Sequence, residues 1–175
     1  MSAKEYLMES SDEPVRLHLK TDPDIVAQQA LWAGLLPGMR VADIGCGAGI
    51  TSSVLKQIVG SEGTVTGIDF ASSRYEYATA HFSGDGISFL CQDVRKPLDN
   101  LDDFDFVFVR FVLEYYLAES FDIVKNITNI LKPGGVLCLV DLDYNCLNHY
   151  GIPKRLEETM REIMDQLQKK ANFDP

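Results

Sequence analysis

The sequence predicts an α/β domain built on a doubly wound parallel sheet. Short apolar runs recur along the chain, helical patterns lie between them, and a glycine-rich turn follows the first run. The runs are nearly continuous in Val, Ile, Leu and Phe, which is typical of parallel strands covered on both faces. Strand and helix alternate over about a hundred residues, which favours right-handed crossovers between layers.

Five apolar runs are predicted strands, and they span residues 39–44, 64–68, 87–90, 104–109 and 135–142. Apolar residues at helical spacing predict helices over 25–36, 50–59, 75–82 and 121–131. Asp22 and Pro23 are expected to cap and begin the first of these helices. Residues 132–135 (Lys-Pro-Gly-Gly) are expected to end the last one before strand five.

The predicted organisation has three parts. Residues 1–36 form an N-terminal helical segment that acts as a lid, residues 37–150 form the core, and residues 151–175 form a C-terminal helix. The apolar face expected on that helix consists of Leu156, Met160, Ile163, Met164 and Leu167.

Composition argues against several function classes. The chain has 175 residues and a formal net charge of -10, and Lys169-Lys170 is its one basic cluster, so nucleic acid is not expected as a partner. No apolar stretch is long enough to span a membrane, and charges fall where a signal peptide would be apolar, so we expect a cytoplasmic protein. Four dispersed cysteines are expected to be reduced thiols, and no metal site is predicted because the histidines lie far apart.

A glycine-rich segment, Asp43-Ile-Gly45-Cys46-Gly47-Ala-Gly49, follows the first predicted strand. Glycines at alternate positions let the backbone turn sharply and approach a ligand, and the next helix offers free N–H groups. The alternative is a tight strand-to-helix turn without a ligand. A dinucleotide fingerprint requires a further glycine where this chain has Ile50, so that pattern fails. Asp43 suits a cationic ligand better than a pyrophosphate.

Two more carboxylates follow strands two and three. Asp69 is placed to accept hydrogen bonds from the hydroxyls of a ribose, with a helix N-cap as the alternative role. Asp93 is placed to accept from an adenine amino group, with a solvated turn residue as the alternative. Three acidic residues after three successive strands meet at the sheet edge where doubly wound folds bind ligands.

These motifs resemble those of the class I S-adenosylmethionine-dependent methyltransferases, which have a Rossmann-like fold. The resemblance covers residues 37–143. DIGCGAG is similar to the first motif of the family, and GIDF is similar to its ribose motif. QDV is similar to its adenine motif, and LKPGGVLCLVDLD is similar to its junction between the preceding helix and strand five. Residues 110–115 (RFVLEY) make the ubiquinone and menaquinone biosynthesis methyltransferases the most similar group.

The resemblance implies that S-adenosylmethionine is the cofactor. It implies that backbone near Gly45 and Arg110 holds the methionine part, that Asp69 binds the ribose, and that Phe70 stacks on the adenine. Arg16 is expected to pair with the methionine carboxylate, with a solvated surface role as the alternative. The full set of expected cofactor-binding residues is Asp43, Gly45, Cys46, Gly47, Gly49, Asp69, Phe70, Asp93, Val94, Arg110 and Arg16.

Relatives carry two further strands after strand five, and this sequence has no room for them. We therefore expect missing C-terminal strands and a fragment with reduced activity, with a naturally minimal version of the fold as the alternative. We also expect a homodimer through the exposed edge of strand five. Methyl transfer to a small-molecule acceptor is the expected function. The alternatives are a non-catalytic S-adenosylmethionine-binding or partner-binding domain and, third, a nicotinamide-dependent oxidoreductase. The acceptor and the catalytic base are not identified, and the candidate bases are Glu114, Tyr115, Tyr116, Asp141, Asp143, Tyr144, His149 and His18.

Overall fold

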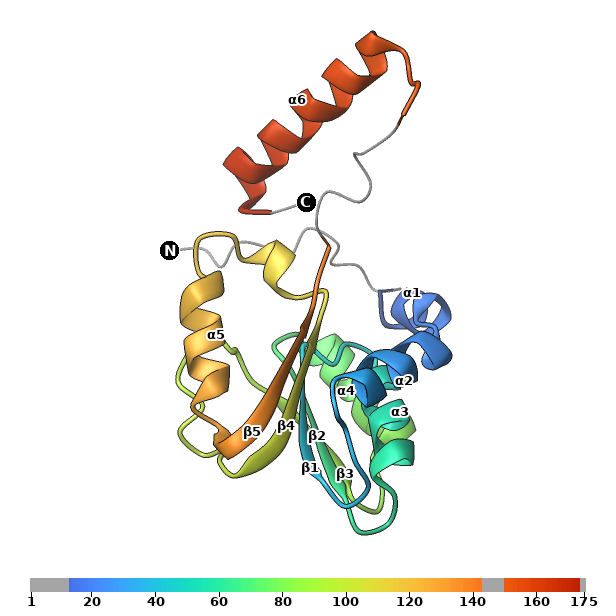
Figure 1. Cartoon of the computed structure of the whole chain (residues 1–175), viewed down its shortest axis with the longest axis vertical. Helices are drawn as coiled ribbons and strands as arrows, with labels where there is room; N and C mark the ends of the chain where they lie inside the picture. Colours follow the sequence, from blue (N-terminus) through green and yellow to red (C-terminus); the bar gives the residue numbers. More distant parts are fainter. Residues whose placement is uncertain (1–12, 143–149, 174–175) are drawn as a thin grey trace.

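A five-stranded parallel sheet forms the centre of the computed structural model, which describes residues 13–142 and 150–173 (Figure 1). Its strands are β1 (Arg40–Ile44), β2 (Thr64–Asp69), β3 (Ile87–Cys91), β4 (Phe104–Arg110) and β5 (Leu131–Val140). The order is β3-β2-β1-β4-β5, and every neighbouring pair is parallel. The predicted doubly wound sheet is therefore confirmed. The chain changes direction across the sheet at β1, which opens a crevice at the carboxyl ends of β1 and β4.

Helices cover both faces of the sheet (Figure 1). The helices α2 (Pro23–Trp32), α3 (Ile50–Val59) and α4 (Ser72–Phe82) lie on one side, and α5 (Ser120–Thr128) lies on the other. As predicted, Asp22 caps α2, accepting hydrogen bonds from two backbone N–H groups, and Pro23 occupies the first helical turn. The short helix α1 (Glu13–Lys20) packs against α4 near the carboxyl ends of the strands.

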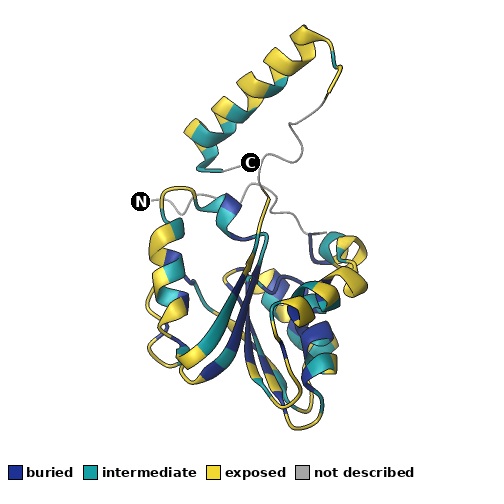
Figure 2. Cartoon of the chain, in the orientation of Figure 1, coloured by how far each residue is buried: buried dark blue, intermediate teal, exposed yellow. Residues whose placement is uncertain are grey.

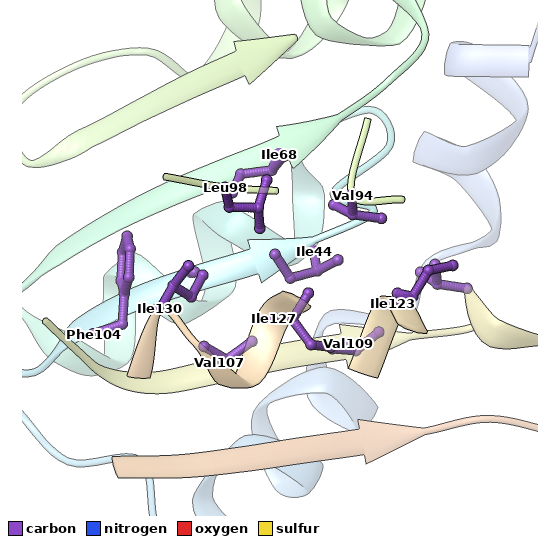
Figure 3. Close-up of a cluster of buried hydrophobic side chains, with 12 residues drawn as sticks. Ile44, Ile68, Val94, Leu98, Phe104, Val107, Val109, Ile123, Ile127 and Ile130 are labelled. Atoms are coloured by element: carbon purple, nitrogen blue, oxygen red, sulfur yellow. The ribbon is translucent and has the colours of Figure 1, made fainter. Parts of the chain in front are cut away.

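The connection from β3 to β4 contains no helix, unlike the strand-helix-strand alternation that the sequence predicted. Loop residues Val94 and Leu98 pack instead into the apolar cluster between the sheet and α5. Figure 3 shows these two side chains with Ile123 and Ile127 of α5 around the strand residue Ile44. Burying such side chains supplies the main stabilising free energy of this layer, and a loop is sufficient to provide them.

β5 begins earlier than predicted, and α5 ends earlier. The apolar spacing predicted a helix through Leu131, but α5 ends at Thr128, and Leu131 pairs with Phe104 as the first residue of β5. The register between β4 and β5 shifts between Phe104 and Phe106, and Val136 is the next residue to pair. This irregularity accommodates Pro133, which has no N–H to donate to a sheet ladder.

The amphipathic helix α6 (Lys154–Ala171) lies beyond the carboxyl ends of the strands and contains no buried residue (Figure 2). Within the described ranges, no strand pairs with the outer edge of β5. None of the helices over the same ranges has both the length and the apolar character needed to cross a membrane.

Candidate functional site

A cavity of about 480 Å³ opens at the carboxyl ends of the strands, and its size is typical of a small-molecule site. Eight of the predicted cofactor-binding residues line it: Arg16, Gly45, Cys46, Gly47, Asp69, Phe70, Val94 and Arg110. The structure therefore brings together residues that come from five separate segments of the chain. Three predicted residues, Asp43, Gly49 and Asp93, lie outside its lining.

The glycine turn after β1 depends on backbone conformations that other residues rarely adopt. Gly45, Gly47 and Gly49 have φ values of 69°, 54° and 89°. A Cβ atom on Gly45 would lie 2.4 Å from Val112, and one on Gly47 would lie 3.0 Å from Leu17. Gly49 has a different role, because its Cβ position faces Ala78 and Phe82 of α4 rather than the cavity.

Asp69, at the end of β2, connects the glycine turn to α4. Its Oδ2 atom accepts a hydrogen bond of 3.0 Å from the Gly47 N–H, and its Oδ1 atom accepts one of 3.0 Å from the Ala71 N–H. Asp69 also forms a buried ion pair with Arg74, at 3.0 Å. The alternative N-cap role is not observed, since α4 begins at Ser72 with Ala71 at the cap position. Sequence reasoning missed Arg74, although its place in the first turn of the helix after Asp69 was a usable signal.

The loop after β3 presents Gln92 and Val94 to the cavity. The Asp93 carboxylate instead pairs with Arg95, which donates from Nε at 2.9 Å and from Nη2 at 2.8 Å. Asp93 therefore lies next to the predicted adenine region with its carboxylate already bound. Gln92, which the sequence analysis did not select, is the polar side chain of this loop that lines the cavity.

Asp43 lies beneath the glycine turn rather than facing the cavity. Its carboxylate accepts a hydrogen bond of 2.6 Å from Ser52 of α3, and both residues are buried. The pKa of Asp43 is raised to about 7, chiefly by burial and also by the nearby Asp69 carboxylate, while the Ser52 hydrogen bond opposes the shift. The direct contact expected between Asp43 and a cationic ligand is thus replaced by a buried contact with α3.

Cationic side chains line the cavity from two directions. Arg110, at the end of β4, donates a hydrogen bond of 3.1 Å to the Gln29 side chain, and burial lowers the pKa of its guanidinium. Arg16 of α1 donates two hydrogen bonds, of 2.7 and 2.6 Å, to the buried Glu13 carboxylate. Arg16 nonetheless remains part of the lining, together with Lys20 of the same helix.

Another wall comes from the 3₁₀ helix η1 (Leu113–Tyr115) and the residue after it. Glu114, Tyr115 and Tyr116 all line the cavity. Burial and the nearby Asp141 carboxylate raise the pKa of the buried Glu114. Burial likewise raises the pKa of Tyr116 to about 12. Glu114 thus combines a position on the cavity wall with a pKa moved towards neutrality, which is the usual signature of a functional carboxylate.

Other candidate bases are placed differently. The Asp141 carboxylate accepts a hydrogen bond of 2.9 Å from the Leu113 N–H, so it holds the start of η1 and does not line the cavity. The His18 ring stacks against Phe82 of α4, outside the lining. Asp143, Tyr144 and His149 lie outside the described residues.

The cavity fits the cofactor that the sequence resemblance implies. A carboxylate can accept about four hydrogen bonds, two on each oxygen. On Asp69, Oδ1 accepts from Ala71 and Arg74, whereas Oδ2 accepts only from Gly47. Oδ2 can therefore accept one more hydrogen bond, such as one from a ribose hydroxyl. The space left by the missing Cβ atoms of Gly45 and Gly47 allows close approach to the backbone. The polar hydroxyls of a nucleoside can therefore meet the Asp69 carboxylate, and its flat base can meet the apolar part of the lining, which includes Val94.

Comparison with known proteins agrees with this geometry. A family model described as a methyltransferase domain matches residues 35–174. The chain is 28% identical over 133 residues to the protein-L-isoaspartate O-methyltransferase of Thermotoga maritima, covering 74% of this chain and 42% of that protein. It is 30% identical over 112 residues to the ubiquinone biosynthesis O-methyltransferase of Coxiella burnetii, covering 63% and 46%. The chain thus spans less than half the length of these curated relatives.

Among solved structures, the chain is similar to an S-adenosylmethionine-dependent methyltransferase from Aquifex aeolicus. The TM-score is 0.61 at 27% identity, and the match covers 90% of this chain and 82% of that one. The fold, the ordered motifs and the family model agree on the cofactor, S-adenosylmethionine, and on the group suggested by the sequence. This chain belongs to the class I S-adenosylmethionine-dependent methyltransferases.

Proposed function

We propose that this chain is an S-adenosylmethionine-dependent methyltransferase that acts on a small-molecule acceptor. One observation carries the proposal: a single cavity joins the glycine turn and Asp69 to the buried carboxylate of Glu114. When bound, S-adenosylmethionine supplies an activated methyl group on its sulfonium. The cavity volume of about 480 Å³ and the Coxiella relative named for ubiquinone biosynthesis support a small acceptor, whereas the Thermotoga relative is named for a protein substrate.

In this proposal, the half of the cavity nearest β1, β2 and β3 holds the cofactor. Asp69 accepts a hydrogen bond from a ribose hydroxyl through Oδ2, and Gln92 and Val94 flank the adenine. Phe70, whose ring lies 5.1 Å from the Arg74 guanidinium carbon, forms an edge of the same region. The guanidinium of Arg110 supplies positive charge for the carboxylate of the methionine part.

Glu114 is the proposed proton acceptor for the methyl acceptor. Its raised pKa makes it a stronger base than an ordinary exposed carboxylate, and its place on the wall puts it in contact with the cavity contents. The proton passes from the nucleophilic atom of the acceptor to the Glu114 carboxylate. Tyr115 donates a side-chain hydrogen bond that favours the charged form of Glu114, and Asp141 fixes the start of η1.

The first test is calorimetric titration of the protein with S-adenosylhomocysteine and, separately, with NAD. We expect binding of the former alone. Turnover is then measured as release of S-adenosylhomocysteine when the protein receives S-adenosylmethionine and either the small-molecule or the macromolecular fraction of a cell extract. Turnover with the macromolecular fraction alone would contradict a small acceptor. Binding without turnover in either fraction would favour the non-catalytic binding domain.

The role of Glu114 is tested by Glu114→Gln, with Glu76→Gln on the exposed side of α4 as the matched control. We expect Glu114→Gln to lower turnover by about 10²-fold or more while S-adenosylhomocysteine binding is unchanged, because removal of a general base affects only the chemical step. Equal turnover in Glu114→Gln and the control would remove Glu114 from this role.

A further inference from the structure

We infer that Asn172 and Phe173, here called the C-terminal wall, determine acceptor specificity by closing one side of the cavity with an aromatic ring. The wall favours a planar, apolar acceptor. The inference rests on the proposed function, because it names the acceptor class for the same cavity. Neither residue belongs to a motif recognised in the sequence.

The local conformation at the end of α6 directs Phe173 to the cavity. Asn172 follows the last helical residue, Ala171, and adopts a left-handed conformation with φ 56° and ψ 33°. This conformation ends the helix, and asparagine adopts it more readily than most residues. The next residue, Phe173, belongs to the cavity lining.

Three hydrogen bonds fix Asn172 to the segment that directly follows η1. The Leu117 N–H donates to the Asn172 carbonyl at 3.1 Å, and the Ala118 N–H donates to its Oδ1 atom at 3.0 Å. The Asn172 Nδ2 group donates to the Glu119 carboxylate at 2.6 Å. Each contact joins residues more than fifty positions apart, so the end of α6 is held at one place on the body of the protein. A hydrogen bond to a charged carboxylate is among the stronger ones in proteins.

The fixed segment lies next to the residues that form the proposed acceptor side. Phe173 packs against Tyr115, with ring centroids 5.5 Å apart and ring planes tilted by 52°. Both rings line the cavity, and Tyr116 and Leu142 line it as well. Three aromatic rings and an aliphatic side chain therefore surround the region next to Glu114. Such a wall stacks or makes edge contacts with a planar ring and fits a puckered, saturated molecule less well.

A matched pair of probes tests this selection. 2-Naphthol and decahydro-2-naphthol share a carbon skeleton and a hydroxyl group but differ in planarity. Binding of each probe is measured by NMR titration of the protein saturated with S-adenosylhomocysteine. We expect 2-naphthol to bind about fivefold more tightly, a ratio in the range typical of a favourable aromatic pair.

Two substitutions at Phe173 separate ring shape from apolar character. Phe173→Leu keeps an apolar side chain and is expected to reduce the preference for 2-naphthol, since only the rings of Tyr115 and Tyr116 then remain, whereas Phe173→Tyr keeps the third ring and should retain the full preference. Phe121→Leu is the matched control, since Phe121 lies on α5 with 89% of its surface exposed and outside the cavity lining. Affinity for S-adenosylhomocysteine should stay the same in all three variants.

Asn172→Ala tests the anchor independently of the ring. We expect faster hydrogen exchange at the Ala118 amide and about fivefold weaker binding of 2-naphthol, since both side-chain hydrogen bonds that hold the wall are lost. Asn129→Ala, at the end of α5, is the control.

The outcomes distinguish this inference from the proposed function. If the wild-type protein does not bind S-adenosylhomocysteine, the proposed function and this inference both fail. If it binds S-adenosylhomocysteine but binds the two probes equally, or if Phe173→Leu keeps the full preference, only the C-terminal wall is overturned. Unchanged exchange at Ala118 in Asn172→Ala would likewise reject the anchor.

Discussion

The Ser52 hydroxyl of α3 donates a hydrogen bond of 2.6 Å to the Asp43 carboxylate of β1, and neither residue has more than 1% of its surface exposed. This contact joins the strand before the glycine turn to the helix after it. Because burial raises the pKa of Asp43 from 3.8 to about 7, against the opposing effect of this hydrogen bond, the buried carboxylate makes the stability of the fold depend on pH.

The folded protein holds a proton on Asp43 at pH values where the unfolded chain has released it. The contribution of Asp43 to stability is therefore complete below about pH 4 and is lost as pH rises through about 7. We expect Asp43→Asn to remove this dependence, which amounts to at most about 1.4 kcal/mol per pH unit. Urea unfolding of both proteins at pH 5 and pH 8 measures it. An equal change in the free energy of unfolding in the two proteins would contradict the assignment to Asp43.

Asp69 is expected to contribute to cofactor affinity through its remaining acceptor position. Asp69→Asn should weaken binding of S-adenosylhomocysteine by roughly 1.5 to 3 kcal/mol, the range for hydrogen bonds to charged groups. Calorimetry gives the dissociation constant, and the exposed Asp99→Asn is the control. Asp69→Ala should in addition lower the free energy of unfolding by about 3 kcal/mol or more, since Arg74 then lies buried without this carboxylate. An unchanged dissociation constant in folded Asp69→Asn would remove Asp69 from the site.

Gly47 is expected to be necessary for cofactor binding because the ligand must approach its backbone. Gly47→Val should abolish binding, since the new side chain projects into the glycine turn, where even a Cβ atom would lie 3.0 Å from Leu17. Gly60→Val also places a side chain at a positive φ, of 70°, but with no atom within 4 Å of the new Cβ position. Titration with S-adenosylhomocysteine should therefore separate the two variants. Retained binding in Gly47→Val would contradict the assigned pocket.

The outer edge of β5 is expected to support self-association. In the described part of the chain this edge has no partner strand, and Leu139 has 45% of its surface exposed. Unpaired N–H and C=O groups along a strand favour pairing with a second copy. We expect sedimentation velocity to show concentration-dependent dimers that Leu139→Lys disrupts and Leu156→Lys, on α6, leaves intact. A monomer at all concentrations would reject this interface.

The layered architecture and the end of the sheet at which the candidate site lies could be predicted from the sequence. Nearly continuous apolar runs reveal buried parallel strands, and the carboxyl ends of such strands meet at one edge, so Gly45, Asp69 and Arg110 could be assigned to one cavity in advance. Local chemistry determined the start of α2 at Asp22 and Pro23 in the same way. These features depend on the spacing of residues or on residues adjacent in the chain, and both can be read from the sequence.

Which polar side chains already have a hydrogen-bond or ion-pair partner within the protein depends on three-dimensional packing. Asp93 pairs with Arg95 inside a single loop, and the conformation of that loop decides this contact. Asp69 pairs with Arg74, and Asp43 pairs with Ser52, and each choice depends on the directions in which a strand and the helix after it point. The same reason explains Phe173, whose place beside Tyr115 requires a contact between positions far apart in the chain. Periodicity and motif spacing describe neighbouring positions in the sequence. Contacts between distant positions depend instead on how the side chains of different layers pack together in the folded protein.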